Sequence, residues 1–467
     1  MIKKILSLFF ILLLLSCNSN RKGENAGISI GGEIVNPKSE YVVIAKGDCI
    51  VDSVKLEKDN TFLYSSKNLT PGLYSFRHNE YQVMHLEPGD SIMLRVNTMD
   101  FDESLTYTGV GAEKNNLLIE MFLYNEAESR LMPKLYILPP AEFQKKIDSM
   151  KTERIIFYNE FKKNNTVSEN FSKIVSASIN YDYYSKKELY ASAYNARERF
   201  SGPEEFPKKF YSYRDDIDFN NNQLKTYYPY FLFLNRYFDN MAYEEYNGIH
   251  WFDRKSYIHN LHKMELIGDI VKDEELRNNL LRLSARRYLL NGKNAEKEND
   301  IKEYFLRLST NEAYKKEITK LAEATIKLTP GEKIPNVLLV DANNNNRSLR
   351  DVIKKHTVLY FWSSNSIKHY RDIHSRAAEL HDRFPEYDFV AINTDSHFKK
   401  WRETINNNGY TKSYEYQIDD LDDAERKLVL NSMNKAIILD HKGRILENNA
   451  NIFVVNIETL LLGHLNK

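Results

Sequence analysis

Cysteine is almost absent from this sequence, which has only two in 467 residues, Cys17 and Cys49. If N-terminal processing commits Cys17 to another bond, a single thiol remains and no intramolecular disulfide can form. We expect Cys49 to be buried and unreactive, because the apolar residues Ile50 and Val51 follow it in an expected strand. An exposed Cys49 that pairs with another protein is the alternative. The cysteine count therefore argues against catalysis by a dithiol.

An excess of either charge is also missing, since 65 basic residues balance 65 acidic residues. This balance removes any general electrostatic case for binding nucleic acid. The sequence also lacks a glycine-rich phosphate loop and a His-Glu-x-x-His motif, which mark nucleotide and zinc-protease sites. We therefore expect no cofactor.

Histidines at helical spacing are the remaining hint of a metal site. His259 and His262 lie three residues apart, and His374 and His381 lie two helical turns apart. A protein metal site needs several converging ligands and further groups that orient them. Because no third ligand follows from the spacing, we expect no bound metal.

The longest apolar run, residues 5–15, is short for a permanent membrane span. Lys3 and Lys4 precede it, and Leu-Leu-Ser-Cys at residues 14–17 ends it. The pattern resembles a bacterial lipobox, so we expect a lipoprotein signal peptide at residues 1–17 and lipidation of Cys17. An ordinary secretory signal or a short membrane anchor is the alternative.

Residues 18–27 are polar and are expected to be a tether to the membrane. The resemblance to lipoproteins implies a lipid-anchored protein of the cell envelope. The residues after Cys17 begin Asn-Ser and lack an acidic run, which favours the periplasmic side of the outer membrane.

Two further regions precede the C-terminal part. Residues 28–110 carry short apolar segments separated by turn residues, which is typical of a small β-sandwich. The expected strands are 28–35, 41–44, 50–56, 61–64, 72–76 and 91–96. Residues 111–328 show helical spacing interrupted by prolines and are expected to form a helical domain. The aromatic cluster at residues 227–233 is expected to pack between helices.

The C-terminal region, residues 333–467, predicts an α/β domain with a mixed sheet. Residues 358–362 read Val-Leu-Tyr-Phe-Trp and residues 389–395 read Phe-Val-Ala-Ile-Asn-Thr-Asp, which are typical of buried strands. A helical pattern at residues 367–384 separates them, as in a βαβ unit. Residues 436–445 predict a strand, a turn and a further strand.

These segments resemble the TlpA-like thioredoxin family, in which the first strand is followed by Phe-Trp-Ala-Ser-Trp-Cys-x-x-Cys. Aligned on Phe361 and Trp362, the two cysteine positions hold Ser366 and His369. Counted back from the final turn, Asn434 occupies the position of the family's cis-proline. The resemblance therefore implies a degenerate active site, with trans geometry expected before Asn434.

A serine hydroxyl cannot replace the thiolate that thiol–disulfide exchange requires. We expect Ser366 to cap the following helix and His369 to lie in its first turn. A Ser366 nucleophile activated by His369 is the alternative, but Ser-x-x-His lacks the orienting acid and oxyanion hole of known triads. We expect no catalytic residue here.

The sequence thus predicts a lipid-anchored envelope protein with a β-rich, a helical and a redox-inactive thioredoxin-like part. Its thioredoxin-like face is expected to bind an envelope protein or peptide, with Trp362 and Asn365 on the binding face. The rival hypothesis is a thiol–disulfide oxidoreductase, which the family resemblance implies. Fold resemblance alone does not decide between them.

Overall fold

The computed structural model describes residues 27–47, 49–198, 206–221, 223–245, 253–411 and 414–466. The expected signal peptide, Cys17 and the tether up to residue 26 lie outside the described residues. The chain divides into two compact units, residues 1–237 and residues 238–467. Within the described ranges, no helix has both the length and the apolar character needed to cross a membrane.

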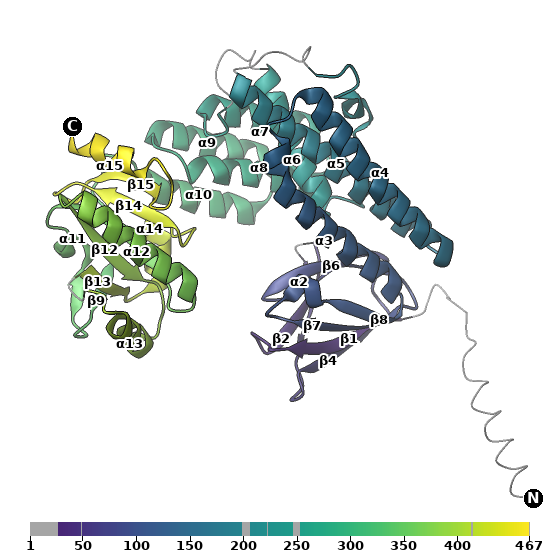
Figure 1. Cartoon of the computed structure of the whole chain (residues 1–467), viewed down its shortest axis with the longest axis horizontal. Coiled ribbons are helices and arrows are strands. Elements are labelled where there is room, and N and C mark those ends of the chain that lie inside the picture. The colour runs from purple at the N-terminus through teal and green to yellow at the C-terminus, as the bar shows by residue number, and fades with distance from the viewer. Residues whose placement is uncertain are drawn as a thin grey trace, which may run out of the picture. The chain divides into compact units, whose positions relative to one another are not determined.

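Residues 28–110 are rich in sheet, as predicted (Figure 1). The strands are β1 (Ile28–Val35), β2 (Tyr41–Lys46), β3 (Cys49–Lys55), β4 (Thr61–Ser66), β5 (Gly72–His78), β6 (Glu80–Leu86), β7 (Ser91–Asn97) and β8 (Thr106–Val110). They form two four-stranded sheets, in the orders β4-β1-β7-β8 and β3-β2-β5-β6. Ile30, Phe76 and Ile92 belong to one buried cluster that draws on both sheets.

Two of these strands, β6 and β8, are absent from the prediction. β6 reads Glu-Tyr-Gln-Val-Met-His-Leu, and its polar residues hide the apolar alternation on which a strand prediction depends. Gln82 and His85 are nevertheless buried. Each has a hydrogen-bonding partner, Asp102 and Asn170 respectively, which offsets the cost of burying polar groups.

Cys49 is exposed, which corrects the expectation of a buried thiol. It begins β3, an edge strand of its sheet. The next residue, Ile50, is 65% exposed. The apolar residues of this strand indicated a strand correctly, but the strand lies at the margin of the sheet and is largely uncovered.

The short helix α2 (Phe101–Ser104) lies between β7 and β8, and a helical region follows the sheets. Its elements are α3 (Ala112–Leu135), α4 (Pro140–Asn164), α5 (Glu169–Glu198), the 3₁₀ helix η2 (Ser212–Asp216), α6 (Tyr228–Glu245), α7 (Tyr257–Ile270), α8 (Glu274–Leu289), α9 (Ala295–Leu308) and α10 (Glu312–Ile326). Tyr227, Tyr230 and Phe233 are buried, so most of the aromatic cluster packs in the interior as predicted, but Tyr228 is exposed. The boundary between the two units falls within α6.

The C-terminal sheet has seven strands in the order β10-β9-β13-β12-β11-β14-β15. The strands are β9 (Leu338–Asp341), β10 (Asn346–Ser348), β11 (His356–Trp362), β12 (Tyr387–Asn393), β13 (Glu415–Ile418), β14 (Lys435–Leu439) and β15 (Ile445–Asn451). The helices are α11 (Leu349–Val352), α12 (Ile367–Arg383), α13 (Phe398–Asn408), α14 (Leu421–Leu428) and α15 (Ile457–Leu465). The β11–β12 and β12–β13 pairs are parallel and the other pairs are antiparallel, which confirms the mixed sheet.

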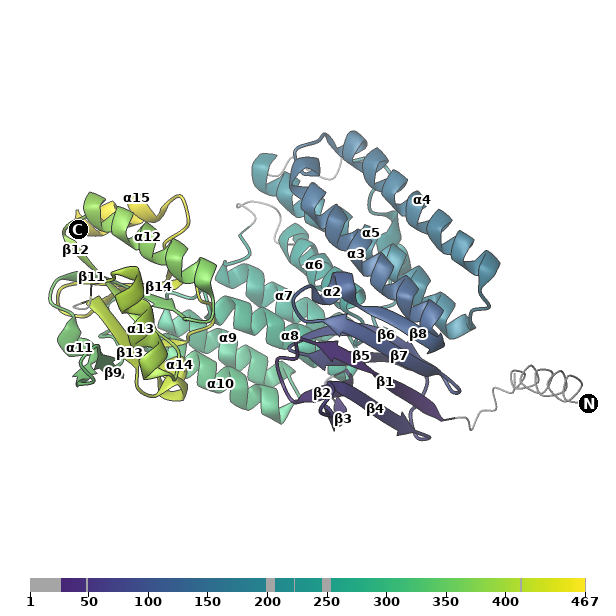
Figure 2. The same cartoon turned by 60° about the horizontal axis from the view of Figure 1, so that its bottom comes forward.

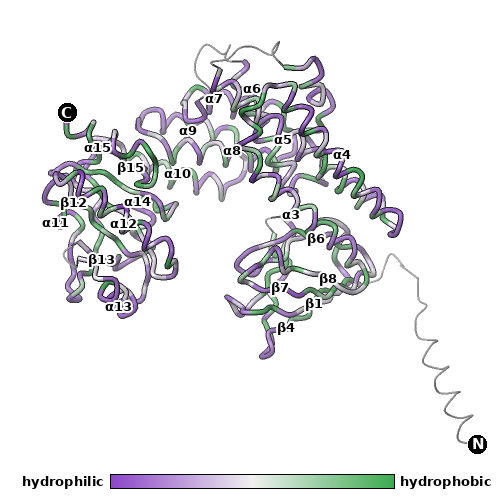
Figure 3. The backbone as a smooth tube through the Cα atoms, in the orientation of Figure 1, coloured by the Kyte–Doolittle hydropathy of each residue, from purple (hydrophilic) through white to green (hydrophobic). Residues whose placement is uncertain are grey.

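The central strand β11 is buried on both faces of this sheet. Successive side chains of a strand point to opposite faces. Val358, Tyr360 and Trp362 therefore enter the cluster beneath α12, and Leu359 and Phe361 enter the cluster beneath α14. Figure 3 shows hydrophobic stretches along the strands near β14 and more hydrophilic residues along the outer helices α12 and α13. Helices thus cover both faces of the sheet.

Candidate functional site

The turn between β11 and α12 lies at the carboxyl end of a parallel strand. Because β11 and β12 run parallel, their carboxyl ends meet at the same edge of the sheet. The turn, residues 363–366, therefore lies beside Asp395, which follows β12. Side chains from two separate parts of the sequence meet here.

Asp395 fixes the shape of this turn. Its carboxylate accepts hydrogen bonds from the Ser363 hydroxyl and from the Ser364 backbone N–H, the latter at 2.6 Å. Asn393 donates a further bond at 3.1 Å. Burial raises the pKa of Asp395, but the bonds from Ser363 and Ser364 outweigh it and hold the pKa below its usual value. Asp395 is thus an ionised anchor for the turn.

Ser366 stands at the N-cap position of α12 and its carbonyl accepts from the Tyr370 N–H at 3.0 Å. Its hydroxyl makes no capping hydrogen bond, which differs from the expected side-chain cap. The side chain is exposed. In the described part of the chain, Ser366 and His369 share no hydrogen bond, so the geometry gives no activated serine.

His369 and Asn434 are brought together by the fold. The His369 Nε2 atom lies 3.0 Å from the Asn434 Oδ1 atom, although the residues are 65 positions apart. The described peptide bonds are all trans, including those at Asn434. Two positions that the family resemblance assigns to redox chemistry therefore contact each other through a hydrogen bond between an imidazole and an amide.

Trp362 is fully buried, so its indole supports the turn from beneath and does not lie on a binding face as expected. Its ring lies 5.7 Å from that of Tyr370 and 5.0 Å from that of His374. Asn365 is exposed and accepts a hydrogen bond from Lys400 at 2.6 Å. Of the two residues predicted for the binding face, Asn365 alone reaches the surface.

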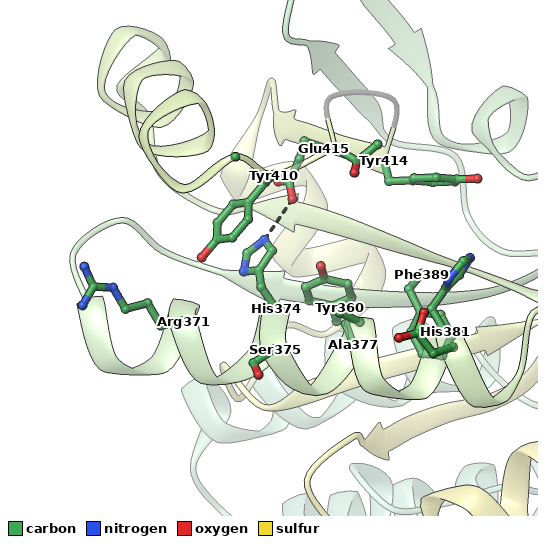
Figure 4. A pocket seen from close by; sticks show the side chains of 14 residues that line it. Tyr360, Arg371, His374, Ser375, Ala377, His381, Phe389, Tyr410, Tyr414 and Glu415 are labelled. Carbon is green, nitrogen blue, oxygen red and sulfur yellow. Dashed lines mark hydrogen bonds and ion pairs between the residues drawn. The ribbon is translucent and has the colours of Figure 1, made fainter.

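A pocket of about 460 Å³ lies farther along α12 (Figure 4). Its floor holds a buried pair, in which the His374 Nε2 atom lies 2.9 Å from a Glu415 carboxylate oxygen. The other ring nitrogen of His374 lies 2.6 Å from the Tyr370 carbonyl. The Tyr410 ring stacks on the imidazole at 3.8 Å with 3° between the planes.

Burial raises the pKa of the Glu415 carboxyl group more than its contact with His374 lowers it. Since both ring nitrogens of His374 are already engaged, the imidazole has no free nitrogen with which to act as a base. The pair therefore organises the pocket floor and joins α12 to β13. His374 and His381 both line this pocket, but the structure gathers no metal-type cluster of His, Cys, Asp or Glu among the residues it describes.

Lys435 is buried directly after Asn434. Its ammonium group donates to the carbonyls of Leu428, at 2.7 Å, and Val429, at 3.0 Å, and so caps the end of α14. No carboxylate within the described ranges pairs with it. Burial lowers the pKa of Lys435 to about 7.

Sequence reasoning overlooked Asp395, Glu415 and Lys435 as members of this region. Asp395 carried a usable signal, because it ends a predicted parallel strand beside the turn. Glu415 and Lys435 carried none, since their roles depend on burial that only the fold reveals.

Comparisons with known proteins agree with this geometry. Residues 354–445 match a family model described as thioredoxin-like. The C-terminal domain is thioredoxin-like. The comparison with curated proteins found no match.

Solved structures similar to this chain include thiol–disulfide oxidoreductases. The thioredoxin domain of one from Bacteroides vulgatus is 20% identical, with a TM-score of 0.25, and the match covers 29% of this chain and 98% of that one. A thiol:disulfide interchange protein from Bacteroides sp. is 19% identical, with a TM-score of 0.23 and coverage of 26% and 80%. A thioredoxin-like protein from Bacteroides caccae is 14% identical, with a TM-score of 0.36 and coverage of 60% and 93%.

The buried Lys435 predicts a pH dependence of stability. Between pH 7 and about 10.4, the unfolded chain keeps the lysine proton that the native state has lost. The unfolded state then binds more protons, so this group makes the free energy of unfolding rise with pH, by up to about 1.4 kcal/mol per pH unit.

Urea unfolding at pH 7, 8 and 9 checks this expectation by comparing the wild type with Lys435→Met. The free energy of unfolding of the wild type, relative to that of the variant, should increase as pH rises. The exposed Lys442→Met is the matched control, and it should follow the wild type at every pH. Parallel curves for the wild type and Lys435→Met would contradict the assignment.

Proposed function

We propose that this protein is a lipid-anchored lipoprotein of the cell envelope whose thioredoxin-like domain is redox-inactive and binds a protein or peptide. The observation that carries the proposal is the absence of cysteine from residues 333–467. Thiol–disulfide exchange proceeds by attack of a thiolate on a disulfide, and this domain has no thiol. The fold is retained without the group that performs the reaction.

The surface around the former active site supports a binding role. Ile367, beside Ser366, is 57% exposed, and Met433, beside Asn434, is 38% exposed. The Phe453 ring lies 6.3 Å from that of His369 and is 39% exposed. Apolar side chains that surround a few hydrogen-bonding groups are typical of protein interaction surfaces.

The second candidate is a thiol–disulfide oxidoreductase of the TlpA-like family. It is favoured by the similarity to solved oxidoreductases, but it would have to use Cys49 or a thiol supplied by a partner. Cys49 is exposed at the edge of the N-terminal sheets, outside the thioredoxin-like domain. An isolated thiol cannot resolve a mixed disulfide intramolecularly.

The N-terminal sequence supports the membrane anchor, with lipid on Cys17 and the folded part on the periplasmic side of the outer membrane. Several acyl chains hold a protein stably, since each buried methylene contributes about 0.8 kcal/mol. We also infer that the two N-terminal sheets pack as a sandwich, because both contribute to one hydrophobic cluster.

Insulin reduction separates the two candidate functions. With dithiothreitol as the electron source, the purified protein should accelerate precipitation of insulin no more than an equal amount of albumin does. Cys49→Ser should behave like the wild type. Sustained turnover that Cys49→Ser abolishes would show that the protein is an oxidoreductase and would refute the proposal of a redox-inactive protein.

A crosslinking pull-down from intact envelopes tests the binding face. Ser366→Ala and His369→Ala remove groups from this face without opening the core, so capture of at least one specific envelope protein should fall severalfold. Arg426→Ala is the control, because α14 covers the opposite face of the sheet. If both variants captured every partner as the wild type does, the face would have no binding role.

Membrane fractionation tests the anchor. Cys17→Ser removes the atom that would carry the lipid, so the protein should lose label from a radioactive fatty acid and move from the membrane to the soluble fraction. Cys49→Ser is the matched control and should stay labelled and membrane-bound. Unchanged labelling of Cys17→Ser would disprove lipidation at this residue.

A further inference from the structure

The N-terminal unit has an incompletely covered sheet edge that is separate from the thioredoxin-like domain. β6 is the last strand of its sheet and pairs with β5 alone (Figure 2). The side chain of Asn115, on α3, accepts from the His85 N–H at 2.7 Å and donates to the His85 carbonyl at 3.1 Å. Asn115 therefore takes the place of a neighbouring strand at His85.

The remaining part of this edge has no neighbouring strand. Because backbone groups alternate in direction along an antiparallel strand, Tyr81 and Val83 point their N–H and C=O groups the same way as His85, away from β5. No residue in the described part of the chain forms a hydrogen bond with these groups. Buried backbone groups are nearly always paired, so these unpartnered groups at the strand edge are available to a further strand.

A cavity of about 210 Å³ adjoins this open edge. Tyr81 and Val83 line it, together with residues from α2, α3, α5 and the start of α6. Three of its aromatic side chains are exposed, namely Tyr81 at 53%, Phe122 at 40% and Tyr228 at 55%. The cavity therefore offers aromatic surface beside unpaired backbone groups.

One charged side chain lines the cavity, and it is negative. Asp102 accepts a hydrogen bond from Gln82 at 2.5 Å, and none of the lining residues is Lys, Arg or His. The pKa of Asp102 lies above its usual value, chiefly because the carboxyl group is partly buried. The hydrogen bond from Gln82 lowers this pKa, and the nearby Glu103 and Glu126 raise it. A cation from a ligand would complement this site, since carboxylates and aromatic faces both attract cations.

We propose that an extended peptide binds here as an added strand along Tyr81 and Val83, and inserts a Lys or Arg side chain between the aromatic rings to reach Asp102. The backbone edge supplies affinity and the cavity selects the basic side chain, as in other strand-addition interfaces. This site is independent of the face proposed for the thioredoxin-like domain.

Fluorescence anisotropy with full-length protein tests the site. The probe is a fluorescein-labelled peptide, acetyl-Thr-Val-Arg-Val-Thr-amide, which places one basic side chain at the centre of a strand. Replacing its arginine by neutral citrulline should weaken binding about tenfold or more, the factor that corresponds to 1.4 kcal/mol. Asp102→Asn should weaken binding of the arginine peptide similarly and leave the citrulline peptide unaffected.

Two peptides N-methylated on alternate residues test strand addition, because only every second amide of an added strand faces β6. The peptide whose methylated amides face β6 should bind about tenfold more weakly than the peptide whose methylated amides point away from β6. Asp100→Asn is the protein control, since it changes the same charge on an exposed residue outside the cavity lining, and it should bind the arginine peptide like the wild type.

Several results would overturn the proposal. Equal affinity for the arginine and citrulline peptides would show that the site does not recognise a cation. Equal affinity for both methylated peptides would show that the peptide does not bind as an added strand. Binding of arginine amide as tight as that of the peptide would indicate a site for small cations. Displacement of the peptide by self-association would assign the edge to a second copy of the chain.

Discussion

The parallel pairing of β11 with β12, with both faces of β11 buried, is the constraint on which the C-terminal domain depends. Val358, Tyr360 and Trp362 of β11 pack beneath α12, and Leu359 and Phe361 pack beneath α14. The parallel pairing also brings the ends of the two strands together, so that Asp395 can bind Ser363 and Ser364. The turn between β11 and α12 is therefore fixed by the sheet and by one ionised carboxylate, neither of which requires cysteine.

This arrangement explains how the turn keeps its shape without a cysteine in the domain. The position that the family resemblance assigns to the first cysteine holds Ser366, which is exposed and makes no capping bond. The position of the second holds His369, which bonds to Asn434 across the turn. Beneath them, His374 and Glu415 join α12 to β13 in a buried pair. Polar contacts thus hold the surface of the turn, and one buried polar pair lies within the otherwise apolar core beneath it.

The sequence predicted β11, β12 and the β14–β15 hairpin because their apolar runs fit a sheet that is covered on both faces. It missed β10 and β13, which are short and carry polar residues. It did not reveal β6, whose polar residues find partners supplied by other elements. It also misjudged Cys49 and Trp362, since an apolar pattern shows that a strand exists but not whether it lies at an edge or which of its side chains the neighbouring helices cover. Lys435 and Glu415 depend on burial from every side, which only the assembled fold shows.

The central claim is that the scaffold of this domain would support a dithiol at positions 366 and 369, although neither position holds cysteine and a trans peptide bond precedes Asn434. The most direct measurement is the redox equilibrium of Ser366→Cys/His369→Cys in glutathione buffers, followed by thiol labelling in a Cys49→Ser background. The account predicts that the new cysteines form a reversible intramolecular disulfide and that insulin reduction appears. If they stayed as thiols under oxidising buffers, or formed the disulfide only on unfolding, the retained scaffold would be contradicted.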